Sequence, residues 1–150
     1  CKSNSSTYWD VLLDRGKWIS AVAADDSHTN KKDMFLGWTM IKAKDLRLKT
    51  IMQALREGCF YSSSGPSIYK LDIEADLISI ECTPVKEINI VANRYLGRKY
   101  KAEAGQVITK MDIILKKPKW AKIDPTYFRV EIVDQDGNRA WTNPFRWEIR

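Results

Sequence analysis

The sequence has few of the residues from which metal centres and disulfide scaffolds are built. It contains 1 histidine and 3 cysteines in 150 residues, and Cys1, Cys59 and Cys82 lack the CxxC spacing of a zinc site. No apolar run approaches the roughly 20 residues of a membrane span, so we expect no membrane partner. The first residues lack the apolar core of a signal peptide, and the odd number of cysteines favours a reducing compartment such as the cytoplasm.

Charge of one sign is not concentrated in any part of the chain. Residues 1–66 carry 10 Lys and Arg against 7 Asp and Glu, and residues 67–150 carry 15 against 12, so the net charge of +6 divides into +3 and +3. Because there is no basic tail, we expect a mild attraction to anions and no nucleic-acid partner. The 44% hydrophobic and 29% charged content is that of a folded globular protein and excludes disorder.

Residues 1–66 show helix and strand patterns in alternation. Apolar residues at helical spacing before Gly16 predict a first helix. Residues 18–24 are almost all small or apolar, which predicts a strand covered on both faces, as in a parallel sheet. Asp45 is placed to cap a second helix with an apolar stripe, over about residues 46–57.

After Pro66 the hydrophobic period changes to two. Apolar and polar residues alternate over about residues 69–75, 78–82, 88–92, 111–115 and 128–132. Such alternation predicts half-buried antiparallel strands, and about seven of them would make a sandwich. The turn-rich residues 63–67 therefore mark the predicted boundary between an α/β segment, 1–66, and a β-sandwich module, 67–150.

The strongest chemical signal is the run Asp25-Asp26-Ser27-His28, which follows the predicted strand 18–24 directly. Ligands of α/β folds gather at the carboxyl ends of the strands. A carboxylate and an imidazole two positions apart can bind zinc, manganese or iron. The same residues are also typical of a capped turn followed by a solvated histidine, so the spacing alone leaves both interpretations open.

Residues 18–28, which end in Asp-x-His, resemble the last metal-binding strand of the PHP-domain proteins (polymerase and histidinol phosphatase). Three further stretches resemble the branch of that family with a β-sandwich tail, the CehA/McbA-like metallohydrolases. They are Gly-Trp-Thr at 37–39, the run from Ala-Leu-Arg to Ser-Gly-Pro at 54–66, and Ala-Trp-Thr-Asn-Pro-Phe at 140–145. The four stretches cover nearly the whole chain in order.

The resemblance implies an α+β fold. Residues 1–66 would be the C-terminal α/β remnant of a PHP (β/α)7 barrel, and residues 67–150 an antiparallel immunoglobulin-like β-sandwich. It also implies that Asp26 and His28 are metal ligands, and that Asp25 is an additional carboxylate beside the site and not a ligand. The complete proteins would use a divalent metal to activate water for attack on a phosphoester or a related bond.

The other ligands of the family, including its N-terminal His-x-His motif, are missing from this sequence. A catalytic metal needs about three protein ligands and an open position. We therefore expect a C-terminal fragment of a metal-dependent phosphoesterase, cut before Cys1, that binds metal weakly or not at all and has no catalytic residues of its own. Its barrel strands would lack neighbours and could pair in a homodimer.

An alternative from a different class is a non-catalytic β-sandwich module that binds anionic ligands or another protein. Cations alternate with aromatic residues at 98–101 and again at 116–122. This pattern suits a polyanion-binding surface, and it equally suits solvated strand ends. Metal content and turnover of a generic phosphoester distinguish the two classes.

Overall fold

Most strands of the structure lie where apolar and polar residues alternate in the sequence. The structure, a computed structural model, describes residues 5–28, 33–93 and 96–148. Its helices and strands in chain order are α1 (Ser6–Asp14), β1 (Trp38–Ile41), α2 (Leu48–Arg56), β2 (Phe60–Ser63), β3 (Ile68–Glu74), β4 (Leu77–Val85), β5 (Glu87–Ala92), β6 (Arg98–Lys101), β7 (Ile108–Ile114), β8 (Tyr127–Val133), β9 (Arg139–Thr142) and β10 (Phe145–Arg146).

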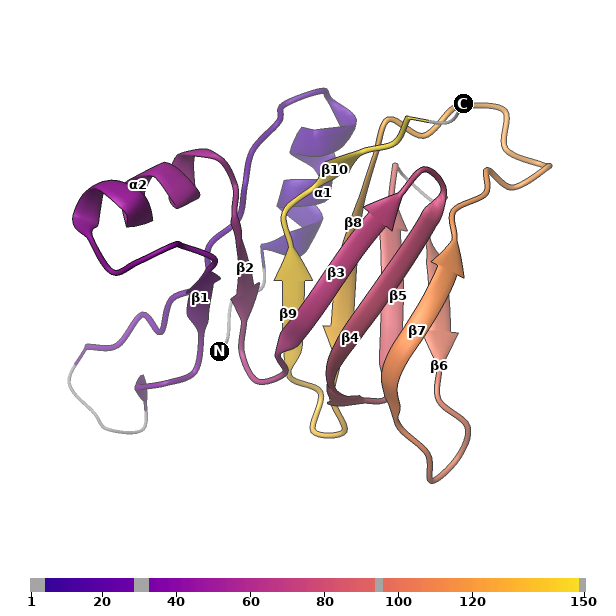
Figure 1. Cartoon of the computed structure of the whole chain (residues 1–150). Coiled ribbons are helices and arrows are strands. Elements are labelled where there is room, and N and C mark those ends of the chain that lie inside the picture. The colour runs from indigo at the N-terminus through magenta and orange to yellow at the C-terminus, as the bar shows by residue number, and fades with distance from the viewer. Residues whose placement is uncertain (1–4, 29–32, 94–95, 149–150) are drawn as a thin grey trace.

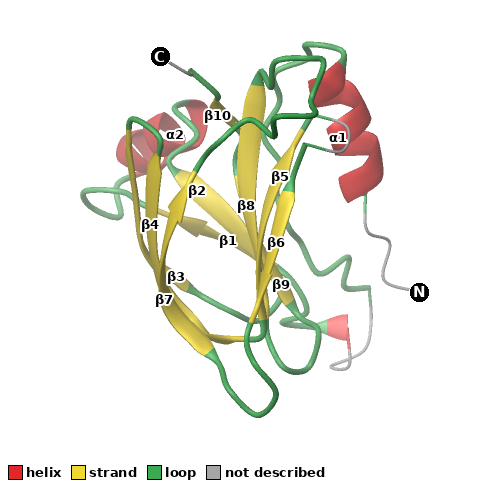
Figure 2. Cartoon of the chain, turned by 90° about the vertical axis from the view of Figure 1, so that its right-hand side faces the viewer, coloured by secondary structure: helices red, strands yellow, loops and turns green. Residues whose placement is uncertain are grey.

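The strands form two sheets, and every pairing within the described residues is antiparallel. The larger sheet has the order β1-β2-β9-β8-β5-β6, with β10 also paired to β8, and the smaller sheet has the order β3-β4-β7. The smaller sheet lies in front of the larger one in Figure 1. Figure 2 shows α1 on the opposite side of the larger sheet, so that sheet is covered on both faces.

The main core fills the space between the two sheets. Its fully buried side chains come mostly from β4, β5 and β8, and include Ile78, Ile80, Val85, Ile88, Val130 and Ile132. In β8 the alternate residues Phe128, Val130 and Ile132 join this core, whereas Tyr127 belongs to a second cluster with Trp9 and Leu13 of α1. Strand β8 is therefore buried along its whole length.

The back face of β8, toward α1, holds a buried ion-pair network. The Arg129 side chain is 2% exposed. Its Nε and Nη2 donate to the two carboxylate oxygens of Asp10 in α1, each at 3.0 Å. Its Nη1 donates to Glu131 at 3.3 Å, and Glu131 also accepts from Arg139 of β9. The Trp9 ring lies 4.7 Å from the Arg129 guanidinium carbon, so a cation–π contact adds to the ion pairs.

The predicted fold class is wrong. The described residues contain two short helices and two antiparallel sheets, with no barrel and no (β/α)7 remnant. Residues 18–24 form no strand and no parallel pairing. Strands β1 and β2 of the segment 1–66 join β9 in one sheet with strands of the segment 67–150.

Both predicted helices are present, with shifted ends. Gly16 ends α1 as expected, with a φ of 75° that glycine adopts without strain. Helix α2 begins at Leu48, because Asp45 accepts the Arg47 backbone N–H and closes a turn before the helix. Its apolar stripe is largely open to solvent, with Leu48 76% exposed. Neither helix, at 9 residues each, is long enough to cross a membrane.

We expect Arg129→Met to destabilise the fold by about 3 kcal/mol, because it leaves the carboxylates of Asp10 and Glu131 without their buried partner. Burial already raises the pKa of Asp10, and the neighbouring Arg129 opposes that rise. Urea unfolding followed by tryptophan fluorescence measures the change.

The control is Lys70→Met, which removes an exposed ion pair with Asp72 and should cost less than about 1 kcal/mol. Equal midpoints for the two variants would contradict the role given to Arg129.

Candidate functional site

Side chains, not strand pairing, hold residues 18–26 across the back of the larger sheet. Three alternate backbone carbonyls of this segment accept side-chain hydrogen bonds: Ile19 from Trp9 Nε1 at 2.9 Å, Ala21 from Ser62 Oγ at 2.8 Å, and Ala23 from Thr39 Oγ1 at 3.2 Å. The Ala21 N–H donates to Asn143 Oδ1 at 3.4 Å. The small alanine side chains allow the backbone to lie this close to β1 and β2.

Asp25 fixes the loop that carries the candidate ligands. Its carboxylate accepts the backbone N–H groups of Phe35, Leu36 and Gly37 at 2.7, 2.6 and 2.8 Å. These bonds, the one from Gly37 most strongly, lower the pKa of the Asp25 carboxyl. Because both oxygens are used in this way, Asp25 supports the loop and is not free to bind a metal.

Asp26 has a φ of 54°, in the left-handed region that aspartate tolerates better than most residues. Its backbone carbonyl lies 2.8 Å from Nδ1 of His28. A carbonyl oxygen can only accept, so Nδ1 carries the proton in the neutral ring, and Nε2 keeps its lone pair. Metal-bound histidines are commonly oriented by such a bond to a backbone carbonyl.

Asp26 also lines a groove with a volume of about 630 Å³. The groove lies beside the segment 21–26. Residues of α1, β2 and β9, and residues next to these two strands, complete its lining, among them Trp9, Ser62, Ser64, Asn138, Arg139 and Trp141. Asp25 and Asp33 lie in its lining as well. His28 is exposed beside the groove.

No group of three or more His, Cys, Asp or Glu side chains within the described ranges could hold a metal ion. Asp26 and His28 supply one carboxylate and one imidazole, which suit zinc, manganese or iron but make an incomplete set. Cys82 is buried, which raises the pKa of its thiol to about 11, and the exposed Cys59 contributes to no such group.

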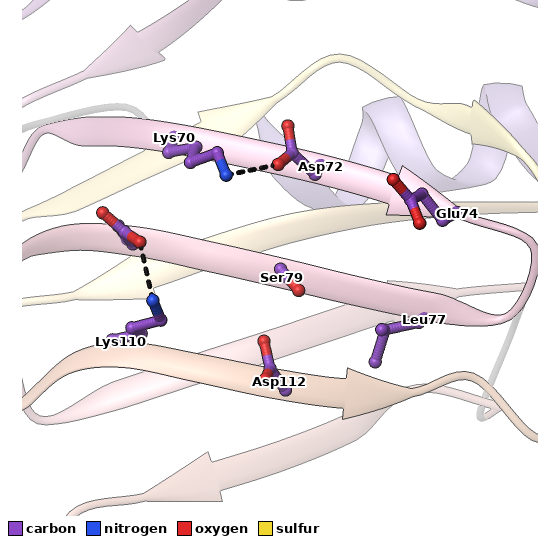
Figure 3. Close-up of a pocket in the computed structure, with 8 residues that line it drawn as sticks. Lys70, Asp72, Glu74, Leu77, Ser79, Lys110 and Asp112 are labelled. Carbon is purple, nitrogen blue, oxygen red and sulfur yellow. Dashed lines mark hydrogen bonds and ion pairs between the residues drawn. The ribbon is translucent and has the colours of Figure 1, made fainter.

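A second hollow, of about 200 Å³, lies on the outer face of the smaller sheet. Figure 3 shows Lys70 pointing toward Asp72 and Lys110 toward the neighbouring strand, where it pairs with Glu81 at 2.9 Å. Asp72, Ser79 and Asp112 lie opposite one another on three adjacent strands. The charges of this face are largely paired and open to solvent, as expected for the outside of a soluble sheet.

The residues that hold the segment were not found from the sequence, because each acts through one hydrogen bond to a distant backbone atom. Ser62 and Thr39 lie directly opposite each other on β2 and β1, and this places both hydroxyls on one face. The only available signal was the conjunction of short polar residues with the small-residue run 18–24. The strand pairing itself could not be read from that pattern.

No family model, curated protein or solved structure matches the chain.

We expect Asp25→Asn to loosen the turn at residues 35–37, because an amide replaces a charged acceptor of three N–H groups. The backbone amide shifts of Phe35, Leu36 and Gly37 report it by NMR. In the wild type these bonds persist above the ordinary carboxyl pKa of 3.8 and are lost as the pH falls through the lower pKa of the folded state.

The matched control is Asp26→Asn, which changes the neighbouring carboxylate and should leave the three amides unshifted. A titration midpoint above 3.8 for those amides would contradict the assigned role of Asp25.

Proposed function

We propose that this chain contributes Asp26 and His28 to the metal centre of a metal-dependent hydrolase that acts on phosphoesters or related bonds. The proposal includes further ligands from a part of a longer polypeptide that the sequence does not contain. Zinc, manganese and iron suit the two donors. On its own the chain is then inactive.

The observation that carries the proposal is the orientation of His28. The bond from Nδ1 to the Asp26 carbonyl holds the ring in the tautomer that ligates through Nε2. The same two-residue turn presents the Asp26 carboxylate, which makes no hydrogen bond or ion pair with any described residue. The fixed ring orientation is the feature that favours a metal ligand, because an exposed carboxylate without a protein partner is also typical of a solvated turn.

The electrostatics of the groove fit a substrate that depends on a bound cation. Three carboxylates, those of Asp25, Asp26 and Asp33, face one cation, Arg139, which is already paired with Glu131. A phosphoester anion would be repelled by this lining. When bound, a divalent metal supplies Lewis acidity and lowers the pKa of its water; the chain's own residues orient the donors and shape the groove.

We expect the isolated chain to bind Zn²⁺ or Mn²⁺ weakly through Asp26 and His28, and to show no turnover of p-nitrophenyl phosphate. Two ligands give too few bonds for a stoichiometric catalytic site. The Cε1 and Cδ2 proton resonances of His28 should shift on Zn²⁺ addition if the ring binds the metal. These resonances are assigned directly, because His28 is the only histidine of the sequence. Asp26→Asn should weaken this response about tenfold or more.

Asp136→Asn is the matched control, since Asp136 lies in the exposed turn between β8 and β9. His28 ring resonances that do not shift when Zn²⁺ is added would contradict the proposed metal centre. Tight metal binding together with turnover of p-nitrophenyl phosphate, both abolished by Asp26→Ala, would instead show a complete enzyme. That result would overturn the proposal that the chain is inactive on its own.

A second candidate function is anion binding by the sandwich, favoured by one contact. Arg98 Nη2 donates to the Lys116 carbonyl at 3.4 Å, so the basic stretch at 98–101 adjoins the basic loop 116–122. Trp120 in that loop is 62% exposed. Cations around an exposed aromatic ring can bind a polyanion through charge and stacking.

For this candidate we expect binding to inorganic polyphosphate that weakens as salt rises. A K116E/K119E variant should lower the log–log salt slope by about 1.5. The control is Lys70→Glu on the face shown in Figure 3, where the lysine is paired with Asp72. Equal salt slopes for the wild type and the double variant in fluorescence anisotropy would exclude the loop as the binding surface.

A further inference from the structure

The segment 18–24 has an unpaired backbone edge. Its residues make no backbone–backbone hydrogen bond with any described residue. The carbonyls of Ile19, Ala21 and Ala23 point toward the body of the protein, where Trp9, Ser62 and Thr39 bond them. Bonding at every second residue is the signature of an extended chain with one edge turned inward.

The other edge of this chain therefore faces solvent. In an extended chain the N–H and C=O of one residue point to the same side, and neighbours point to opposite sides. Side-chain exposure also alternates from Ala21 to Asp26, with the even-numbered residues more exposed, as in an extended chain that packs on one face. Val22 is 69% exposed. The backbone groups of Ser20 and Val22 are thus available for pairing with another strand.

This edge also lacks the charges that protect sheet edges from association. Of the four edge strands of the two sheets, three carry several charged residues each: β6 at Arg98, Lys99 and Lys101, β3 at Lys70, Asp72 and Glu74, and β7 at Lys110 and Asp112. The fourth, the short strand β1, carries none. The segment 18–24 carries none. Trp18 at its start is 47% exposed. An exposed, uncharged, apolar strand edge favours strand addition.

The charges at the two ends of the segment indicate the partner. Lys17 precedes it, and Asp25 and Asp26 follow it. A second copy in antiparallel orientation brings Lys17 of each copy to the acidic end of the other, whereas parallel pairing would bring like charges together. With Val22 opposite Val22 of the second copy, the arrangement has a two-fold axis and is closed.

We propose that the chain forms a homodimer by antiparallel pairing of its residues 19–25, with Val22 at the two-fold axis. The self-complementary edge accounts for the open backbone groups, the missing charges and the opposite charges at the ends. Asp26 and His28 lie just outside the paired residues, with Asp26 next to Lys17 of the second copy, so the His28 variant distinguishes the dimer from the proposed metal centre.

The test uses charge pairing at the axis. The V22E and V22K variants of the full chain should each be monomeric by light scattering and analytical ultracentrifugation, since like charges would lie opposite each other. Each should raise the dimer dissociation constant at least about tenfold. An equimolar mixture of the two variants should associate again, as a heterodimer.

The matched control is V107E, because Val107 is 47% exposed in the loop before β7 and should leave the dimer intact. Circular dichroism confirms that every variant is folded. A monomeric wild type at about 0.5 mM, a V22E variant that still dimerises, or a mixture that stays monomeric would each overturn the proposal. H28A should dimerise like the wild type, so this proposal and the metal centre fail separately.

Discussion

The bond between Arg129 and Asp10 is the interaction on which the back of the molecule depends. It joins the most buried strand, β8, to α1, and therefore places Trp9 over the sheet. Trp9 in turn donates to the Ile19 carbonyl and starts the chain of side-chain bonds that carries residues 18–26 across β2 and β1. The position of Asp26 and His28 thus depends on a guanidinium two strands away. A charge at this depth is costly to bury, and only its complete set of partners makes it tolerable.

This dependence explains why a run of small apolar residues forms no strand. Residues 18–24 have the composition of a buried parallel strand, but α1 and the larger sheet leave them only one face and no neighbouring backbone. Their carbonyls are satisfied one by one by Ser62, Thr39 and Trp9, as buried carbonyls must be. What remains is an edge with open hydrogen-bonding groups, which is uncommon in an isolated folded chain and common where another strand adds.

The sequence predicted those strands that have one face in the core and the other face toward solvent. Period-two alternation correctly located β3, β4, β5, β7 and the inward residues of β8, because one face of each packs in the core between the sheets. It missed β6, whose residues are mostly charged, and β9, where Arg139 and Trp141 face α1 instead of solvent. The barrel remnant was predicted by the resemblance alone, and the antiparallel pairing of β1 and β2 with β9 overturns it.

The residue types of the candidate site were predicted from the sequence, but only the resemblance, and not the local pattern, assigned different roles to Asp25 and Asp26. Two adjacent aspartates look equivalent in a sequence, since either could ligate a metal or cap a turn. The backbone separates them. Extended chain up to Asp25 directs its carboxylate to three N–H groups of the 35–37 turn, whereas Asp26 has a left-handed conformation and its backbone carbonyl bonds to His28. The carboxylate of Asp25 accepts hydrogen bonds from the loop, and these bonds lower its pKa. The Asp26 carboxylate makes no hydrogen bond or ion pair with any described residue, so its oxygens remain available for the proposed metal ion.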